Sequence, residues 1–146
     1  MKAISIKGVL IGGIVDVVTS AVLGIPFALY AMFKVGFADL PKDTVGPAVA
    51  TFVHENIPLY IGQLMVGLCC SVLGGYVAAR LAKHDELLNG ALSAFLCVSL
   101  GIYAITGGKG FTSLFMQIVL LVVSPLLGLL GGYLGRTQNR TAPTIA

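Results

Sequence analysis

The sequence has little charge. Asp, Glu, Lys and Arg make up 10% of its 146 residues, whereas soluble globular proteins carry about 25%. Hydrophobic residues make up 57%, so the chain lacks the polar surface that would cover a water-soluble globule. Tryptophan is absent, and the net charge of +3 comes without a basic cluster that has interleaved aromatic residues. These absences exclude a soluble domain and a nucleic-acid-binding surface.

Residues suited to metal binding or catalysis are also scarce. The three cysteines, Cys69, Cys70 and Cys97, all fall within apolar segments, and no metal or redox spacing connects them. His54 and His84 fall on opposite sides of the predicted membrane domain, so they cannot serve one site. No nucleophile, base and metal set converges. The sequence therefore predicts no metal site, no cofactor and no enzymatic activity.

Long apolar stretches fill most of the chain, at residues 8–33, 57–79, 87–106 and 111–135. A stretch of about 18 apolar residues or more can cross a hydrocarbon core of about 30 Å. In lipid, such a continuous run satisfies its backbone hydrogen bonds as a helix. The predicted fold class is an all-α integral membrane protein. Residues 1–146 would form a single domain, a four-helix transmembrane bundle whose consecutive helices are antiparallel neighbours.

The basic residues of the connections predict an orientation. One side collects Lys2, Lys7, Arg80, Lys83, Arg136 and Arg140, and the other collects Lys34, Lys42 and Lys109. Because cytoplasmic connections are enriched in Lys and Arg, both termini are predicted to be cytoplasmic, in a bacterial inner membrane. The first apolar stretch is too long for a secretory signal peptide, so we expect it to be retained.

The outer loop, residues 34–56, is the one long connection. Residues 47–54 could form a short helix on the bilayer surface, with Val49, Phe52 and Val53 on one side. An irregular loop folded over the bundle is the alternative. The tail, residues 136–146, is polar and is predicted to fray.

A short internal similarity links the second and fourth stretches. Residues 73–80 read Leu-Gly-Gly-Tyr-Val-Ala-Ala-Arg, and residues 130–136 read Leu-Gly-Gly-Tyr-Leu-Gly-Arg. The match is consistent with two helical hairpins in a parallel repeat. Low-complexity membrane sequence also produces such matches by chance.

Glycine occurs 19 times, above its usual share of about 7%. Small residues recur every four positions along the predicted helices, and the glycines of these stripes are Gly8, Gly12, Gly24, Gly67, Gly75, Gly128 and Gly132. Small residues let helix backbones approach each other in lipid, so the stripes are predicted to be packing seams. A glycine-lined pore is the alternative. Because the stripes exceed what one partner helix needs, a homo-oligomer or a larger membrane complex is a predicted partner, besides the lipid bilayer.

Asp16 is the one ionisable side chain well inside a predicted span. A carboxylate at the centre of a bilayer costs about 2.5–3.5 kcal/mol on insertion scales. Residues at a similar predicted depth are Ser71, Ser93, Cys97 and Ser124, with Ser20 one turn further along the first helix and no Lys or Arg. Burial without a cation favours the neutral acid. Asp16 is predicted either to bind a proton or cation in a transport path, or to hold helices together as a hydrogen-bond donor.

Gln63 and Gln117 lie equally far from the outer start of their helices, so they share one predicted level. They could pair as structural contacts between helices, or contact a substrate. The candidate intramembrane polar site therefore comprises Asp16, Ser20, Gln63, Ser71, Gln117 and Ser124.

Two segments of the sequence show a resemblance that implies where the protein is located. Residues 74–82, Gly-Gly-Tyr-Val-Ala-Ala-Arg-Leu-Ala, and residues 87–92, Leu-Leu-Asn-Gly-Ala-Leu, resemble uncharacterised small four-helix bacterial inner-membrane proteins. That resemblance implies a fold and a location but no activity. Small multidrug exporters are similar in having four helices and a first-helix acid, but the chain has no tryptophan for their aromatic cation site. Small flippases of lipid-linked sugars are similar in size, yet only a glycine pair before an acid matches their motifs.

Two functions remain open. The leading hypothesis is a structural or accessory membrane protein that self-associates, or docks on a larger membrane complex, through its Gly/Ser/Ala stripes. The alternative is a small proton-coupled transporter or channel with Asp16 as the titrating residue.

Overall fold

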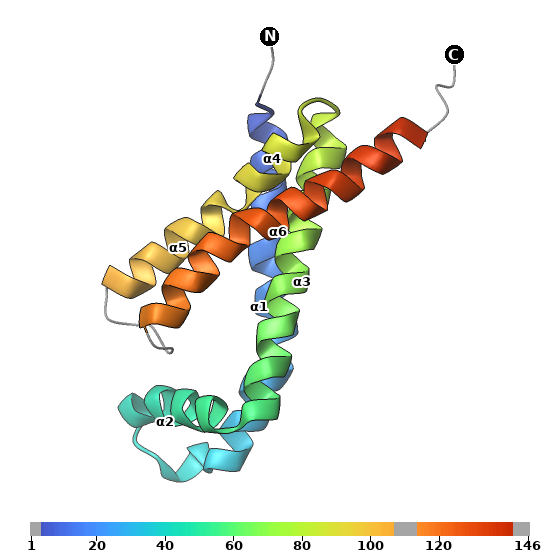
Figure 1. The fold of residues 1–146 in the computed structure, drawn as a ribbon. Coiled ribbons are helices and arrows are strands. Elements are labelled where there is room, and N and C mark those ends of the chain that lie inside the picture. The colour runs from blue at the N-terminus through green and yellow to red at the C-terminus, as the bar shows by residue number, and fades with distance from the viewer. Residues whose placement is uncertain (1–3, 107–113, 142–146) are drawn as a thin grey trace.

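The computed structural model describes residues 4–106 and 114–141, which are helical and contain no strand (Figure 1). In chain order, the helices are α1 (Ile6–Val35), the short 3-10 helix η1 (Phe37–Asp39), α2 (Lys42–Glu55), α3 (Ile57–Ala82), α4 (Glu86–Ser93), α5 (Phe95–Thr106) and α6 (Leu114–Thr141). The predicted all-α fold class is confirmed.

Local signals explain where the long helices begin and end. The Ser5 side chain accepts a hydrogen bond from the Gly8 N–H at the start of α1, and the Asn56 side chain accepts one from the Leu59 N–H at the start of α3. Such side-chain caps satisfy backbone donors that have no partner within the helix. Gly36, with a φ of 71°, ends α1 in the left-handed conformation that glycine adopts without strain.

The pattern of burial is the reverse of that in a water-soluble protein, because polar side chains are buried and apolar side chains face outward. The largest fully buried side chains of the described residues are Asn89, Asp16 and Ser93, whereas apolar Ile6 and Val122 are 72% and 62% exposed. The helical segments long and apolar enough to cross a membrane are Ile6–Val35, Ile57–Ala82, Glu86–Tyr103 and Ile118–Arg140. The chain is therefore a multi-pass membrane protein whose outward-facing apolar side chains contact lipid.

Glycines bring α1 and α3 into backbone contact near the start of α1. A Cβ atom at Gly8 would lie 2.9 Å from the carbonyl oxygen of Ala78, and one at Gly12 would lie 2.5 Å from that of Gly74. Neither position could carry a side chain without moving the helices apart. This close approach supplies the van der Waals contact that holds helices together in lipid.

Glycines also bring the backbone of α6 into contact with those of α3 and α4. A Cβ atom at Gly75 would overlap the backbone of Gly128, and one at Gly132 would lie 2.7 Å from the carbonyl oxygen of Glu86. Gly128 also faces Gly90, with 2.5 Å between its Cβ position and the Gly90 carbonyl oxygen. We call this part of the bundle, around Gly8, Gly12, Gly75, Gly128 and Gly132, the closed end.

Gly24 and Gly67 differ from the other predicted packing glycines. A Cβ atom at either position would meet no other atom of the described chain within 4 Å. Along an ideal helix, a stripe that repeats every four residues rotates by about 160° between Gly8 and Gly24. Gly24 therefore does not lie on the helix face of Gly8 and Gly12 that contacts α3. Gly67 lies where α6 has diverged from α3, so no neighbour reaches it.

The third predicted span, residues 87–106, corresponds to a helical segment apolar enough to cross a membrane, Glu86–Tyr103, which is divided at Ala94 into α4 and α5. Ser93 Oγ donates a hydrogen bond of 2.7 Å to the carbonyl oxygen of Gly90. The carbonyl oxygen of Ser93 lies 2.8 Å from the Cβ position of Gly13 in α1, so α1 approaches the break directly. A serine hydroxyl bound to the preceding turn competes with regular helix bonding, which explains a break without Pro or Gly.

Two further boundaries differ from the prediction. α6 continues past residue 135 to Thr141, because Asn139 accepts a 2.8 Å hydrogen bond from Arg80 of α3 and holds the last turns against that helix. α2 begins at Lys42, earlier than the short helix predicted at 47–54, and takes the place of the irregular-loop alternative. Lys2 and Lys109, which the sequence assigned to opposite sides of the membrane, lie outside the described residues. The orientation in the membrane and the repeat of two hairpins stay predictions.

Candidate functional site

A cavity of about 420 Å³ lies between α1, α3, α5 and α6. In Figure 1, α5 and the first half of α6 slant away from α1 and α3 toward the end of the molecule where α2 lies. We call this part of the bundle the open end. The polar residues that line the cavity are Asp16, Ser20, Tyr60, Gln63, Ser71, Cys97 and Ser124, and the others are Leu64, Gly67, Leu68, Leu120 and Leu127.

Asp16 is the buried acid of this cavity, with only 2% of its surface exposed. Ser71 Oγ of α3 lies 3.5 Å from Asp16 Oδ1, and Cys97 Sγ of α5 lies 3.1 Å from Asp16 Oδ2. The Ser20 hydroxyl donates to the main-chain carbonyl oxygen of Asp16 and lies 3.4 Å from Oδ1. The carboxyl group thus faces three helices, but the two hydroxyl groups reach it only at the long limit of a hydrogen bond.

Gly74 makes the space that Asp16 occupies. A Cβ atom at Gly74 would lie 2.7 Å from Asp16 Cβ. Any larger residue at this position would push Asp16 out of the contact between α1 and α3. The small-residue stripe of α3 therefore positions the acid as well as closing the bundle.

The cavity has acidic character only. Asp16 is the one Asp, Glu, Lys, Arg or His among the described residues that line it. No group of three metal-ligating side chains that could hold a metal ion forms anywhere in residues 4–106 and 114–141. The contacts of Asp16 to Ser20, Ser71 and Cys97 bring no positive charge to its carboxyl group. The site therefore offers one carboxyl group that a cation or a proton could bind.

The structure brings most of the predicted polar site together. The predicted residues that line the cavity are Asp16, Ser20, Gln63, Ser71 and Ser124. Gln117 belongs to α6, but its side chain lies outside the described part of the chain, so its pairing with Gln63 stays a prediction. Ser93, which shares the predicted depth of Asp16, bonds instead to Gly90 and does not line the cavity.

Ser124 differs from the other hydroxyl groups of the cavity. Its Oγ atom is buried and has no hydrogen-bond partner among the described residues. Buried polar atoms in proteins are nearly always bonded, so an exception requires an explanation. Ser124 as a residue lines the cavity, so its hydroxyl group is a candidate contact for a bound molecule once the side chain turns toward the cavity.

Tyr60 is a lining residue that the sequence analysis did not assign to the site. It precedes Gln63, Gly67 and Ser71 on α3 at intervals of three or four residues, which place all of them on one helix face. This spacing is visible in the sequence and could have identified the face once Ser71 was chosen. The leucines of the cavity carry no comparable signal, because leucine is common throughout the membrane spans.

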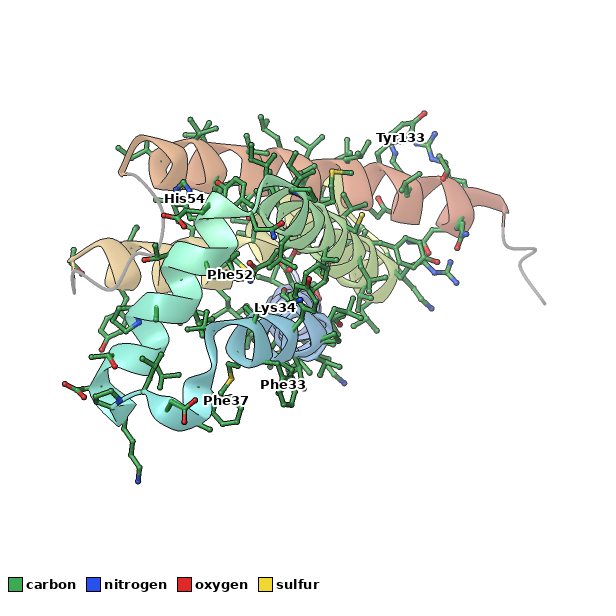
Figure 2. All side chains as sticks on the ribbon, turned by 90° about the horizontal axis from the view of Figure 1, so that it is seen from below. Phe33, Lys34, Phe37, Phe52, His54 and Tyr133 are labelled. Carbon is green, nitrogen blue, oxygen red and sulfur yellow. The ribbon has the colours of Figure 1, made fainter. Side chains whose placement is uncertain are left out.

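A second cavity, of about 290 Å³, borders the first. Val49 and Val53 of α2 line it, and it shares Tyr60 and Gln63 with the cavity at Asp16. The His54 and Tyr60 rings stack with their centroids 5.3 Å apart. Figure 2, viewed from the α2 end, shows α2 extending across this end of the molecule, with His54 near its junction with α3. The amphipathic α2 therefore borders the site from the open end.

Asn89 is the buried polar residue of the closed end, and the sequence analysis missed it. Its side chain is fully buried, and its Oδ1 atom accepts a 2.7 Å hydrogen bond from the Ser5 N–H. Its Nδ2 atom donates to the carbonyl oxygens of His84 and Asp85 at 3.0 and 3.1 Å. Asn89 thereby ties the start of α1 to the turn between α3 and α4.

No family model, curated protein or solved structure matches this chain. The resemblance to small four-helix bacterial membrane proteins stays a prediction. The function is therefore inferred from the geometry of the site.

Proposed function

We propose that this chain is a small proton-coupled transporter of the bacterial inner membrane, with both termini cytoplasmic and Asp16 as the proton-binding residue. The observation that carries the proposal is the burial of Asp16 beside a cavity lined by α1, α3, α5 and α6. Asp16 is itself buried, but its contacts to the Ser20 and Ser71 hydroxyl groups are long, at 3.4 and 3.5 Å, and it adjoins a space that helix packing alone does not require.

The movements of the proton and of a cationic solute are coupled because both compete for the carboxyl group of Asp16. In surroundings of low polarity this group is stable when it is protonated or paired with a cation, and costly otherwise. Because it cannot hold both, binding of a cationic solute releases a proton, and uptake of a proton releases the solute. If the cavity opens alternately to the two sides of the membrane, this competition exchanges one for the other.

Two features of the fold support such alternation. The third span is divided at Ala94 next to α1, and discontinuous helices are typical of transporter binding sites. In addition, the helices are packed through glycines at the closed end and diverge at the open end (Figure 1). A change in the angle between α1/α3 and α5/α6 would therefore change the side from which the cavity is reached.

The accessory function has less support, because it depends on small-residue stripes that are free for a partner. Contacts within the chain already occupy the stripes at Gly12, Gly75 and Gly132. Gly24 remains open, so self-association through that part of α1 stays a prediction.

Proton flux in proteoliposomes tests the transport proposal. Vesicles with an acidic lumen and an entrapped pH-sensitive dye receive sodium, potassium or tetraethylammonium chloride on the outside. We expect at least one of these cations to raise the lumenal pH in a protein-dependent manner, because the cation displaces the proton on Asp16. The Asp16→Asn variant, which keeps the shape of the side chain but cannot ionise, should abolish this response.

Asp43→Asn is the matched control, because Asp43 is an exposed acid of α2 outside the cavity. This variant should retain the full response. Absence of protein-dependent flux with all three cations, or an undiminished response in Asp16→Asn, would reject the proposal.

A further inference from the structure

The lining of the cavity at Asp16 combines one acid, several oxygen atoms and a large apolar surface. We propose that its ligand is a monovalent organic cation with an apolar body, an amphiphilic amine in its protonated form. This inference rests on the proposed transport function and names the class of solute that the transporter would exchange for a proton.

The charge of the ligand follows from Asp16. The cavity has a single carboxyl group and no Lys, Arg or His in its described lining. An anionic ligand would meet like charge once Asp16 is ionised, and a neutral ligand would not displace the proton. A ligand with one positive charge matches the single carboxylate and forms charge-assisted hydrogen bonds that are stronger than those of Ser71 and Ser20 at 3.5 and 3.4 Å.

The oxygen atoms of the site suit a compact cationic head group. Ser71 and Ser20 lie next to Asp16, and Ser124 Oγ, on α6, is buried without a partner. An ammonium group has several N–H donors, so it could bond to the carboxylate and to a hydroxyl oxygen at once. Ser124 lines the cavity, and its hydroxyl group would gain a partner from such a ligand if its side chain turned toward the cavity.

Size and apolar surface distinguish an organic cation from a metal ion. The volume of about 420 Å³ lies within the range of about 300–1,000 Å³ that is usual for small-molecule pockets. Magnesium and calcium are held by about six to eight oxygen ligands in a close shell, whereas this cavity offers one carboxylate and scattered hydroxyl groups. The apolar part of the lining consists of Leu64, Leu68, Leu120 and Leu127, which would contact a hydrocarbon body.

A tryptophan reporter can measure binding directly, because the natural chain contains no tryptophan. Tyr60→Trp places the indole in the lining of the cavity, and Leu127→Trp provides a second reporter if the first does not fold. The probes are phenethylammonium, its neutral analogue 2-phenylethanol and the anion 3-phenylpropionate, each titrated into the purified protein in detergent. The three share a phenylethyl body and differ in charge.

We expect phenethylammonium to change the reporter emission saturably, with an affinity at least about tenfold above that of 2-phenylethanol and 3-phenylpropionate. Adding Asp16→Asn to the reporter variant should remove this preference for the cation while leaving the weak binding of 2-phenylethanol unchanged. Equal affinity for the cation and the alcohol, or a preference that survives Asp16→Asn, would overturn the inference.

Tyr133→Trp is the control for partitioning of the probes into detergent. Tyr133 is 53% exposed on α6 and projects from the outer surface of the helix in Figure 2. A probe that only enters the detergent would change the Tyr133→Trp emission as much as that of the cavity reporters. That result would also overturn the inference.

The binding test and the flux test can give opposite results, so they distinguish the ligand class from the transport function. Selective binding of phenethylammonium without any proton flux would retain the ligand class and reject the transport function. Asp16-dependent flux with sodium or potassium, but without selective binding of phenethylammonium, would retain transport and reject the organic cation.

Discussion

The closed and open ends of the bundle use glycine in opposite ways. At the closed end, Gly12 and Gly75 lie against the backbones of neighbouring helices. Toward the open end, Gly67 faces the cavity and Gly24 meets nothing. A small residue therefore closes a membrane bundle only where a second helix presents a small surface at the same level. Elsewhere it leaves space.

The buried polar residues show the same contrast. Asn89 at the closed end has hydrogen bonds of 2.7 to 3.1 Å to three different residues. Asp16 at the cavity has contacts of 3.1 to 3.5 Å from its side-chain oxygens, and Ser124 Oγ has no partner among the described residues. Fully bonded polar groups specify the fold, whereas incompletely bonded ones are available to a ligand.

The strongest expected effect comes from adding a methyl group to the closed end. In Gly75→Ala, the new Cβ would collide with the Gly128 backbone, which cannot rotate away. We expect a loss of about 3 kcal/mol in the free energy of unfolding, the upper range for overpacking. Thermal unfolding in detergent measures the loss. Gly67→Ala is the matched control and should be neutral or slightly stabilising, because its Cβ meets no atom within 4 Å.

The next effect concerns the buried amide of the closed end. Asn89→Ala removes the acceptor of the Ser5 N–H and the donor to His84 and Asp85. We expect a loss of about 2 kcal/mol, because buried groups left without a partner cost about 1–3 kcal/mol. The control is Gln63→Ala, an exposed amide at the open end, which should change the unfolding temperature little. Equal losses in the two variants would contradict a difference between the ends.

The closed end could be predicted from the sequence better than the open end. A stripe such as Gly8 and Gly12 follows from helix geometry, and its effect on packing follows from the absence of a side chain. The depth of Asp16 along its helix likewise predicted Ser71 and Ser124 at the cavity, although Ser93, at the same predicted depth, bonds to Gly90 instead. Both inferences depend only on where a residue lies along its own helix, and the sequence provides that position.

The features that the sequence did not predict depend on the angles at which helices cross. Those angles cannot be read from the residues of any one helix. Gly24 continues the stripe of Gly8 and Gly12 in the sequence, but its Cβ position has no neighbour within 4 Å. The third span is divided at Ala94, where the Ser93 carbonyl oxygen approaches Gly13 of another helix. The cavity itself exists because α6 diverges from α3, and no residue type marks that divergence.

A substitution that fills the cavity should abolish transport with little change in the free energy of unfolding. Gly67→Leu places a side chain in open space, so its free energy of unfolding should change by less than about 1 kcal/mol, with helix propensity favouring leucine. We expect proton flux in proteoliposomes to be lost, because the leucine occupies the ligand space. Gly24→Leu also meets open space but lies outside the cavity lining, and should keep its flux. A fully active Gly67→Leu would mean that the cavity is not the binding site.

The smallest expected effect on stability comes from removing a hydroxyl group. Ser124→Ala deletes a buried oxygen without a partner, so unfolding should be unchanged or up to about 1 kcal/mol less favourable, while the affinity for phenethylammonium falls. Ser93→Ala removes a hydroxyl that donates to the Gly90 carbonyl oxygen at 2.7 Å, and should instead lose about 1 kcal/mol of stability without a change in affinity. Thermal unfolding and titration of the two variants in the Tyr60→Trp background measure both quantities. If Ser124→Ala loses stability as Ser93→Ala does, the Ser124 hydroxyl has a structural partner and is not held for a ligand.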